Sequence, residues 1–180
     1  MALLSSDKTL FRNRFLAIIE RDGYTFTREV RCDGTIVALL PFRSVPGEPR
    51  LEFLARREVC PAHGPELEYC SITGGLEPGQ SVTETACLEL LEETGYQATE
   101  AELIKLGVVR PTKSADTEVH LFAVDVTGKT AATPTGDGTR FEIGSSVTWV
   151  SAAQGLQIAD PLIVTAIARL QALQPKGGHV

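Results

Sequence analysis

Long apolar runs are missing from this sequence of 180 residues. No stretch approaches the roughly 20 consecutive apolar residues that a membrane-spanning helix needs. The first residues, MALLSSDKTLFRNRF, introduce charges too early and lack the apolar core of a secretory signal peptide. We therefore expect a cytoplasmic protein that makes no contact with a membrane.

Clusters of lysine and arginine are also missing, and the formal net charge is -6. Nucleic-acid phosphates are bound by grouped basic side chains, so the composition argues against general nucleic-acid binding. A small anionic ligand would therefore need metal ions and a few local arginines to compensate its charge.

The four cysteines, Cys32, Cys60, Cys70 and Cys87, show no paired spacing. In a chain without a secretory signal this pattern predicts reduced thiols in or near the core. The run Cys60-x-x-His63, with Cys70 nearby, offers three zinc ligands, but a fourth convincing ligand is missing. We favour reduced thiols over a zinc site.

The chain does contain enough apolar material for one core, with 43% hydrophobic and 22% charged residues. A chain of this size buries roughly 70% of its unfolded surface as one domain. The apolar patterns and the turns between them predict a succession of strands and two helices. The expected strands are 15–20, 24–30, 34–42, 51–56, 69–72, 101–109, 118–126 and 146–150, the expected loops are 60–66, 111–117 and 128–140, and the expected helices are 82–94 and a segment that opens at 160–161. This order predicts a mixed sheet between helices.

The segment from Gly74 to Tyr96, GGLEPGQSVTETACLELLEETGY, is the most informative part of the chain. Ser81 and Glu84 have the spacing of a capping box, and Gly95 supplies a helix stop. The glycines ahead of the helix let backbone carbonyls approach a ligand closely. The pattern is a glycine-rich loop that leads into a short capped helix.

Three glutamates on that helix, Glu89, Glu92 and Glu93, project into one arc, because successive helical residues turn by roughly 100°. Like charges at this spacing repel one another, and a divalent cation would relieve the repulsion. Hard cations such as Mg2+ take oxygen ligands of this kind. A solvated face is the ordinary alternative for Glu-x-x-Glu-Glu, but the loop, the cap and the stop in register favour a metal site.

This segment resembles the Nudix box, the signature of hydrolases that split a nucleoside diphosphate linked to another group. The matching positions are Gly74, Glu89, Leu90, Glu92, Glu93, Gly95 and the apolar Tyr96. The resemblance implies an α/β/α sandwich with a mixed β-sheet and an N-terminal β-hairpin. It also implies Mg2+ (or Mn2+) as cofactor, held by the three box glutamates with help from a loop carbonyl near Gly74 or Ile72.

Softer matches outside the box are closest to the ADP-ribose pyrophosphatase group, which also acts on other nucleoside diphosphate sugars. The matching segments are TREV, LEFLARRE, SADTEVHLFAVDVTG and VTWVS. The resemblance implies a homodimer formed through a hairpin arm at 1–30, a Nudix domain at 31–175 and a disordered tail at 176–180. The expected substrate is a small nucleoside diphosphate compound, and ADP-ribose would give AMP and ribose 5-phosphate.

The resemblance also suggests substrate contacts outside the box. In the hairpin these are Phe26, Arg28 and Glu29, with ordinary hairpin packing as the alternative. On the strand at 51–56 we favour Arg56 slightly over Arg57 as a phosphate clamp, and an ion pair with Glu58 or Glu52 is the alternative.

For the general base, the resemblance points to the loop before the strand at 118–126. The candidates are Asp116 and Glu118, although a strict match falls on Thr117, and Glu142 is a further acid. His120 is expected to pack in or beside the sheet.

Two positions depart from the box. Gln80 replaces its first glutamate and Leu88 replaces its arginine, which orients neighbouring carboxylates in the family. If the two family residues share one network, losing both is less damaging than losing one, because no buried charge is left unpaired. The departures predict weaker metal binding, and they keep open a catalytically idle Nudix fold that binds a nucleotide as a sensor.

Overall fold

The computed structural model describes residues 6–136 and 144–173. Its strands are β1 (Lys8–Arg12), β2 (Leu16–Arg21), β3 (Tyr24–Glu29), β4 (Thr35–Ser44), β5 (Leu51–Val59), β6 (Leu67–Cys70), β7 (Ile72–Gly75), β8 (Ile104–Val109), β9 (Glu118–Asp125) and β10 (Ser146–Ser151). Its helices are α1 (Val82–Thr94), the 3-10 helix η1 (Glu100–Glu102), α2 (Ala152–Gly155) and α3 (Pro161–Leu173). The tail predicted at 176–180 and the candidate acid Glu142 lie outside the described residues.

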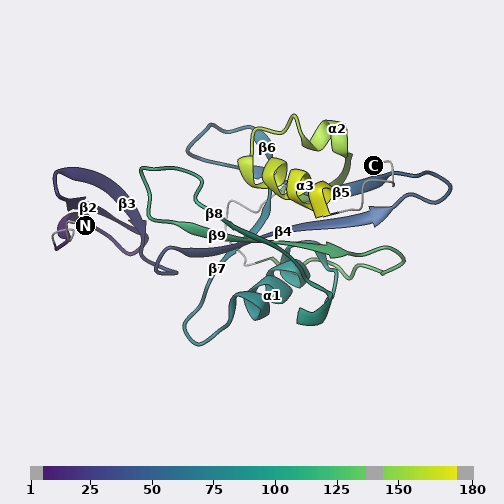
Figure 1. The fold of residues 1–180 in the computed structure, drawn as a ribbon, viewed down its shortest axis with the longest axis horizontal. Coiled ribbons are helices and arrows are strands. Elements are labelled where there is room, and N and C mark those ends of the chain that lie inside the picture. Colours follow the sequence, from purple (N-terminus) through teal and green to yellow (C-terminus); the bar gives the residue numbers. More distant parts are fainter. Residues whose placement is uncertain (1–5, 137–143, 174–180) are drawn as a thin grey trace.

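A mixed sheet of seven strands forms the centre of the molecule. Its order is β10-β5-β4-β9-β8, with β6 beside β5 and β7 beside β4. β4 and β9 run parallel, whereas the other pairs of this sheet are antiparallel. Helix α1 covers one face, and α2 and α3 lie on the other (Figure 1). The predicted α/β/α arrangement is confirmed.

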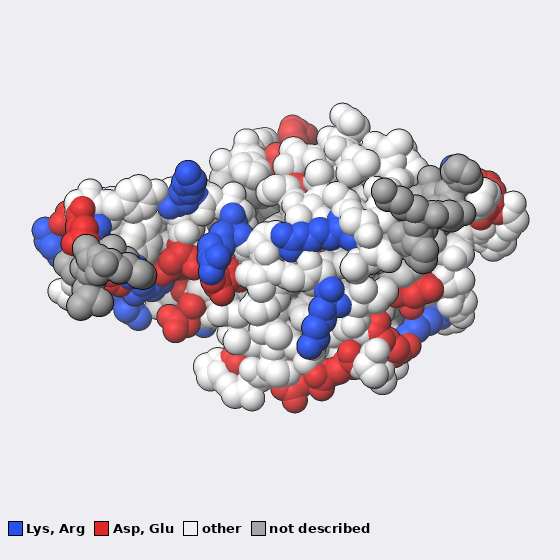
Figure 2. All heavy atoms as spheres, in the orientation of Figure 1, with Lys and Arg blue, Asp and Glu red and all other residues white. Residues whose placement is uncertain are grey.

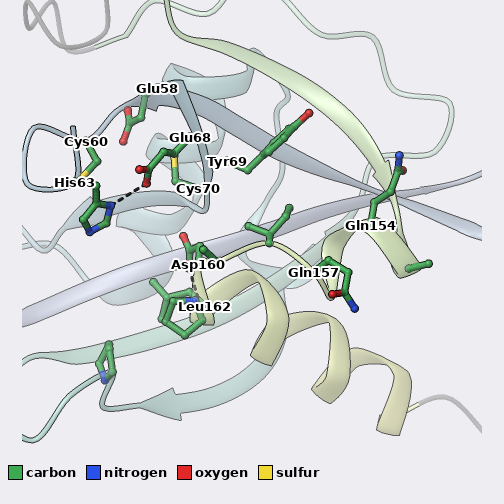
Figure 3. A pocket seen from close by; sticks show the side chains of 15 residues that line it. Glu58, Cys60, His63, Glu68, Tyr69, Cys70, Gln154, Gln157, Asp160 and Leu162 are labelled. Carbon is green, nitrogen blue, oxygen red and sulfur yellow. Dashed lines mark hydrogen bonds and ion pairs between the residues drawn. The ribbon is translucent and has the colours of Figure 1, made fainter. Parts of the chain in front are cut away.

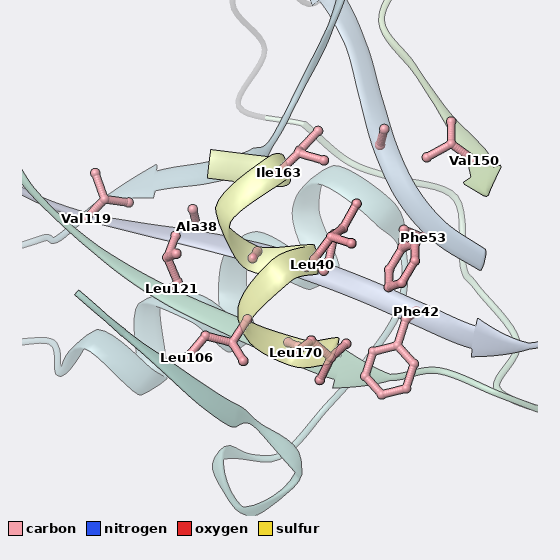
Figure 4. Packing of buried hydrophobic residues seen from close by; sticks show 14 residues of the cluster. Ala38, Leu40, Phe42, Phe53, Leu106, Val119, Leu121, Val150, Ile163 and Leu170 are labelled. Carbon is pink, nitrogen blue, oxygen red and sulfur yellow. The ribbon is translucent and has the colours of Figure 1, made fainter. Parts of the chain in front are cut away.

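The apolar pattern of β4 explains why helices cover both faces. Val37 and Leu39 belong to a buried cluster with α1, while Ala38 and Leu40 belong to a second cluster with α3. Figure 4 shows this second cluster, in which Ile163 and Leu170 of α3 lie against the sheet. Burying each large apolar side chain contributes about 1.5–3 kcal/mol, so the two clusters together fix where α1 and α3 rest.

The N-terminal residues form a separate antiparallel sheet at one end of the molecule (Figure 1). The predicted hairpin of β2 and β3 is confirmed, with Asp22 and Gly23 at positive φ in the turn. The hairpin prediction was incomplete, because β1 pairs with β2 as a third strand. This strand, KTLFR, is short and exposed along its whole length, so no alternation of buried and exposed residues marks it in the sequence.

Backbone contacts tie the N-terminal sheet to the loop before β9. The amide of Thr27 donates to the carbonyl of Ser114 at 2.8 Å, and the amide of Asp116 donates to the carbonyl of Thr27 at 3.1 Å. The hydroxyl of Tyr24 donates to the carbonyl of Lys113 at 2.7 Å. The loop predicted at 111–117 is therefore held by β3 as well as by its own strands.

Several strand boundaries differ from those predicted. The expected strand at 101–109 begins at Ile104, because 100–102 forms η1. The expected strand at 69–72 is two strands: β6 pairs with β5, and β7 pairs with β4. They separate at Ser71, whose amide donates to Oδ2 of Asp160 at 2.7 Å instead of continuing a ladder. The short helix α2 was not predicted, since its four residues are too few to show a helical period.

Candidate active site

The capping predicted for α1 is confirmed. The amide of Glu84 donates to Oγ of Ser81 at 3.1 Å, and the amide of Ser81 donates to Oε2 of Glu84 at 2.7 Å. Gly95 ends the helix in the left-handed region at φ 75°, and its amide donates to the carbonyl of Leu91 at 2.8 Å. Both ends of the helix are therefore fixed, which sets the direction of its side chains.

The three box glutamates line one cavity of about 440 Å3, which we call the carboxylate cavity. Helix α1 supplies Glu89, Glu92 and Glu93, and the segment before β4 closes the cavity opposite. Its lining also includes Glu29, Arg31, Cys32, Ile36 and residues 73–77. The structure thus brings together the four predicted metal-site residues, since Gly74 is among those lining residues. Of the residues expected in the hairpin, Glu29 alone is among them.

Gly74 is needed for this arrangement. It lies on β7 opposite Val37 of β4, on the side of the sheet that α1 covers. A Cβ atom built on Gly74 would overlap the carboxylate of Glu89. Any side chain here would displace Glu89, so the glycine of the motif makes room for a carboxylate.

Arg56 enters the site from β5. Its side chain is only 7% exposed, and Nη1 donates to Oε1 of Glu93, which is itself 9% exposed. Nε of Arg56 also lies 3.3 Å from Oε2 of Glu58. The sequence placed Arg56 as a candidate phosphate clamp; the structure places it between two carboxylates of its own chain.

The donor set fits a divalent cation in two respects. Oε2 of Glu93 is buried and has no hydrogen-bond partner among the described residues, and an unpaired buried carboxylate oxygen is costly unless a cation or donor meets it. The lining is rich in carboxylates, the ligands that Mg2+ and Mn2+ prefer. As they stand, no three His, Cys, Asp or Glu side chains within 6–136 and 144–173 are grouped as a metal site requires. The three glutamates therefore share a cavity without meeting at one point.

The predicted residues of the hairpin lie elsewhere. Phe26 is buried in the small core of the N-terminal sheet with Ala17 and Ile19. Nε of Arg28 lies 2.6 Å from Oδ2 of Asp116, and this bond raises the pKa of Arg28. Phe26 and Arg28 are therefore occupied by their own chain, and their role in substrate binding stays a prediction.

The candidate general bases also lie outside the carboxylate cavity. Glu118 begins β9, and its carboxylate accepts from Arg110. Asp116 is bound to Arg28, and its Oδ1 is buried with no partner among the described residues. His120 lies within β9 as expected. The structure thus brings neither acid to the three glutamates.

The departures from the box face a different part of the surface. Gln80 and Leu88 line a separate hollow with Glu84, Cys87 and Thr99, among others. Oε1 of Gln80 accepts from Oγ1 of Thr85 at 2.9 Å, which ties the loop to the helix. Leu88 is 44% exposed. Neither departure removes a group from the carboxylate cavity.

A larger cavity of about 1170 Å3 lies on the α3 side, between the β5–β6 hairpin and the start of α3 (Figure 3). We call it the β6–α3 cavity. Its lining includes Glu58, Tyr69, Ala153, Asp160 and Leu162. Sequence reasoning missed it, because it joins segments about 90 residues apart that no local pattern links.

The zinc candidates line the β6–α3 cavity without forming a zinc site. Nδ1 of His63 lies 2.8 Å from Oε2 of Glu68 (Figure 3), and no metal-ligating group forms with Cys60 and Cys70 among the described residues. Burial, with help from Glu58, raises the pKa of the Cys70 thiol. The described cysteines are all free.

The other candidate arginine, Arg57, follows Arg56 on β5 and pairs with Tyr69 of β6. Its guanidinium carbon lies 5.2 Å from the centre of the Tyr69 ring. Nε of Arg57 is buried with no hydrogen-bond partner among the described residues. On the face shown in Figure 2, lysines and arginines are scattered, and acidic side chains collect along the margin on the side of α1.

Fold and site together define an α/β/α domain with an acidic cavity between a glycine-rich strand and a capped helix. Residues 37–165 match the family model described as the NUDIX domain. The chain therefore belongs to the Nudix family, a family of pyrophosphohydrolases that generally use divalent metal ions.

One similar protein, from Bacillus subtilis (strain 168), is named "Putative 8-oxo-dGTP diphosphatase". It is 42% identical over 78 residues, which cover 43% of this chain and 46% of that protein. The match thus spans about half the length of the curated relative. Among solved structures, an ADP compounds hydrolase superimposes with a TM-score of 0.63 and 17% identity, covering 94% of this chain and 92% of that chain. At this identity the likeness shows the fold alone.

Within the described ranges, every helix is too short or too polar to cross a bilayer.

Proposed function

We propose that this protein hydrolyses the pyrophosphate bond of a nucleoside diphosphate linked to another group, and that the substrate is ADP-ribose or a nucleoside diphosphate sugar. The products would be a nucleoside monophosphate and a sugar phosphate. The observation that carries the proposal is the single cavity lined by Glu89, Glu92, Glu93 and Gly74. Such a cavity suits a cation and a diphosphate together.

The chain's own groups would share the work. Glu89, Glu92 and Glu93 would hold Mg2+ or Mn2+, and the free oxygen of Glu93 supports its place in that set. A bound divalent ion lowers the pKa of water and neutralises the charge of the diphosphate. Arg57 has an uncommitted donor for a phosphate oxygen, and Arg56 remains a second candidate. Glu118 is retained as the candidate general base.

The β6–α3 cavity supports a substrate with a bulky group beyond the diphosphate. A further hollow connects the two cavities, since it shares Ile36 and Thr73 with the carboxylate cavity and Glu58 and Asp160 with the β6–α3 cavity. At about 1170 Å3 it exceeds the size of ordinary small-molecule pockets, which run from about 300 to 1,000 Å3. Its side chains include the acidic Glu58, Glu68 and Asp160, and none of the described lining residues is an arginine or a lysine. That rim disfavours phosphates and suits a neutral, hydroxyl-bearing or amine-bearing moiety, such as a sugar or a nucleobase.

One panel of candidate substrates distinguishes the proposed function from two alternatives, a nucleoside triphosphate hydrolase and a nucleotide sensor. The name of the Bacillus relative suggests a nucleoside triphosphate, and the two box departures, together with the ungrouped carboxylates, favour a nucleotide sensor. The protein is assayed with Mg2+ and with Mn2+ against ADP-ribose, nucleoside diphosphate sugars, dinucleoside polyphosphates and nucleoside triphosphates including 8-oxo-dGTP. We expect the fastest turnover with ADP-ribose or a nucleotide sugar. If the protein prefers nucleoside triphosphates, the proposed substrate class is wrong. If it binds a nucleotide without hydrolysing it, the protein is a nucleotide sensor.

We also propose a homodimer formed through the N-terminal sheet. This sheet and its turns expose large apolar side chains, which in a monomer would face water. They are Leu10, Phe11, Phe15, Leu16 and Tyr24. In light scattering we expect the mass of two chains, and the double substitution Leu10→Glu with Phe11→Glu should give the mass of one. A wild-type monomer at micromolar concentration would overturn this proposal.

A further inference from the structure

Three charged side chains form a line from the rim of the β6–α3 cavity to α1. Glu58 lines that cavity, and its Oε2 lies 3.3 Å from Nε of Arg56. Nη1 of Arg56 donates to Oε1 of Glu93. Along this line the side-chain exposure falls from 32% at Glu58 to 7% at Arg56 and 9% at Glu93. The guanidinium thus sits at the buried junction of two carboxylates.

The backbone of Arg56 is held firmly at this junction. β5 lies between β6 and β10, and Arg56 pairs with Cys70 on one side and Val147 on the other. The planar guanidinium presents donors in a fixed fork, so a carboxylate bound at Nε limits how the Nη groups can turn. Glu58 therefore restricts the direction in which Arg56 meets Glu93.

We infer that Glu58 is a positioning residue for the carboxylate cavity: it holds Arg56, and Arg56 in turn holds Oε1 of Glu93 so that Oε2 is left for the cation. The expected effects on kcat and KM rest on the proposed function, whereas the expected effects on Mn2+ binding do not. It gives Arg56 an orienting role in a box whose own arginine is replaced by Leu88. Neither Glu58 nor its bond to Arg56 belongs to the box.

A matched control lies on the same strand. Glu52 of β5 pairs with Arg43 of β4, and the Arg43 Nη2 to Glu52 Oε2 distance is 2.7 Å. This ion pair resembles the Glu58 to Arg56 pair in chemistry but does not reach α1. Glu52→Gln therefore removes the same charge from the same strand without touching the line to Glu93.

The first test measures binding of Mn2+ alone, without substrate, by electron paramagnetic resonance. Glu58→Gln removes a negative charge and leaves Arg56 to compete for Glu93, so the Kd for Mn2+ should rise by about five-fold. Arg56→Gln removes a positive charge next to a ligand of the cation, so the Kd should fall by about five-fold even though Glu93 is no longer held in place. Arg56→Lys keeps the charge and should stay near the wild-type value, as should Glu52→Gln. A merely structural defect would weaken binding in both Glu58→Gln and Arg56→Gln.

The second test separates positioning from substrate contact. Glu58→Gln and Arg56→Gln should lower kcat by about 10- to 100-fold, the usual cost of losing an outer-shell partner of a metal ligand. KM should stay within about two-fold. Arg56→Lys should recover part of kcat, because it restores the charge but not the fork.

Three results would overturn the inference. They are equal Mn2+ affinity in Glu58→Gln and the wild type, a rise of the Mn2+ Kd in Glu52→Gln as large as in Glu58→Gln, or a rise in KM with kcat unchanged. Melting curves accompany each variant; if Arg56→Gln does not fold, the comparison of Glu58→Gln with Arg56→Lys decides. If the wild type hydrolyses nothing in the panel, the proposed function fails, while the Mn2+ shifts still decide the role of Glu58.

Discussion

The two faces of the central sheet carry different kinds of site. Under α1 the cavity is small, about 440 Å3, and glutamates dominate its side chains. Beside α3 the cavity is much larger, about 1170 Å3, and its floor combines proline, alanine and leucine with a few acids. The first face is suited to charge and chemistry, and the second to the shape of a neutral group. Glu58 of the second cavity contacts Arg56, and Arg56 contacts Glu93 of the first.

This difference predicts that substitutions under α1 change kcat, whereas substitutions beside α3 change KM. Only interactions made in the transition state alter kcat, whereas uniform binding contacts alter KM. Glu58 is the stated exception, because it lines the β6–α3 cavity but acts on Glu93 through Arg56. Any other substitution that crosses this division would weaken the comparison.

The largest effect is expected from Glu93→Gln. Its buried Oε2 lacks a partner and would bind the cation, so the neutral amide should lower kcat by about 100- to 1,000-fold. Steady-state kinetics with Mg2+ measures this. Glu84→Gln on the same helix is the control, because a glutamine preserves the capping box. Equal rates for wild type and Glu93→Gln would remove Glu93 from the mechanism.

The next effect is expected from Gly74→Ala. The new Cβ would displace the carboxylate of Glu89, so kcat should fall by about 10- to 100-fold and metal affinity should fall as well. If the effect acts through Glu89, adding Gly74→Ala to Glu89→Ala should cost little more, because the two changes are coupled. Full additivity in this double-mutant cycle would contradict the steric account.

A smaller effect is expected on the other face from Ala153→Trp. Ala153 is exposed at the wall of the β6–α3 cavity, so an indole there should obstruct the neutral part of the substrate. We expect KM to rise about 10-fold, because the loss of a few apolar contacts with the substrate weakens binding by about that factor. The value of kcat should stay nearly unchanged. Ala131→Trp, at another exposed alanine, should leave both constants unchanged. A fall in kcat with KM constant would assign this cavity to chemistry.

The smallest effect is expected from the double change Gln80→Glu and Leu88→Arg, which restores the family residues. Both positions line a hollow apart from the carboxylate cavity. Since exposed charges contribute little, Mg2+ affinity and turnover should change by less than about three-fold. This expectation differs from the one drawn from the sequence, in which the two departures weaken metal binding. A gain of ten-fold or more would show that the departures matter.

The parts predicted well from sequence are those fixed by local spacing. The cap at Ser81, the stop at Gly95 and the shared arc of Glu89, Glu92 and Glu93 all follow from positions a few residues apart. The mixed sheet followed from apolar segments of the right length. Local patterns therefore sufficed for α1 and for the order of the central elements.

The parts that sequence could not supply depend on distant pairing. Arg56 meets Glu93 across 37 positions, and Ser71 meets Asp160 across 89. No periodicity links such residues, so the split between β6 and β7 and the β6–α3 cavity were not predicted. Likewise, the burial of Phe26 and the ion pair of Arg28 with Asp116 depend on how the N-terminal sheet folds.

The most direct test of the central claim is a 31P NMR time course of ADP-ribose with the wild-type protein and Mg2+, repeated with excess chelator and with Glu93→Gln. The account predicts the loss of the two diphosphate signals and the growth of two phosphomonoester signals, from AMP and ribose 5-phosphate, in the first sample alone. Equal rates in all three samples would contradict it, because the acidic face under α1 would then have no part in the reaction.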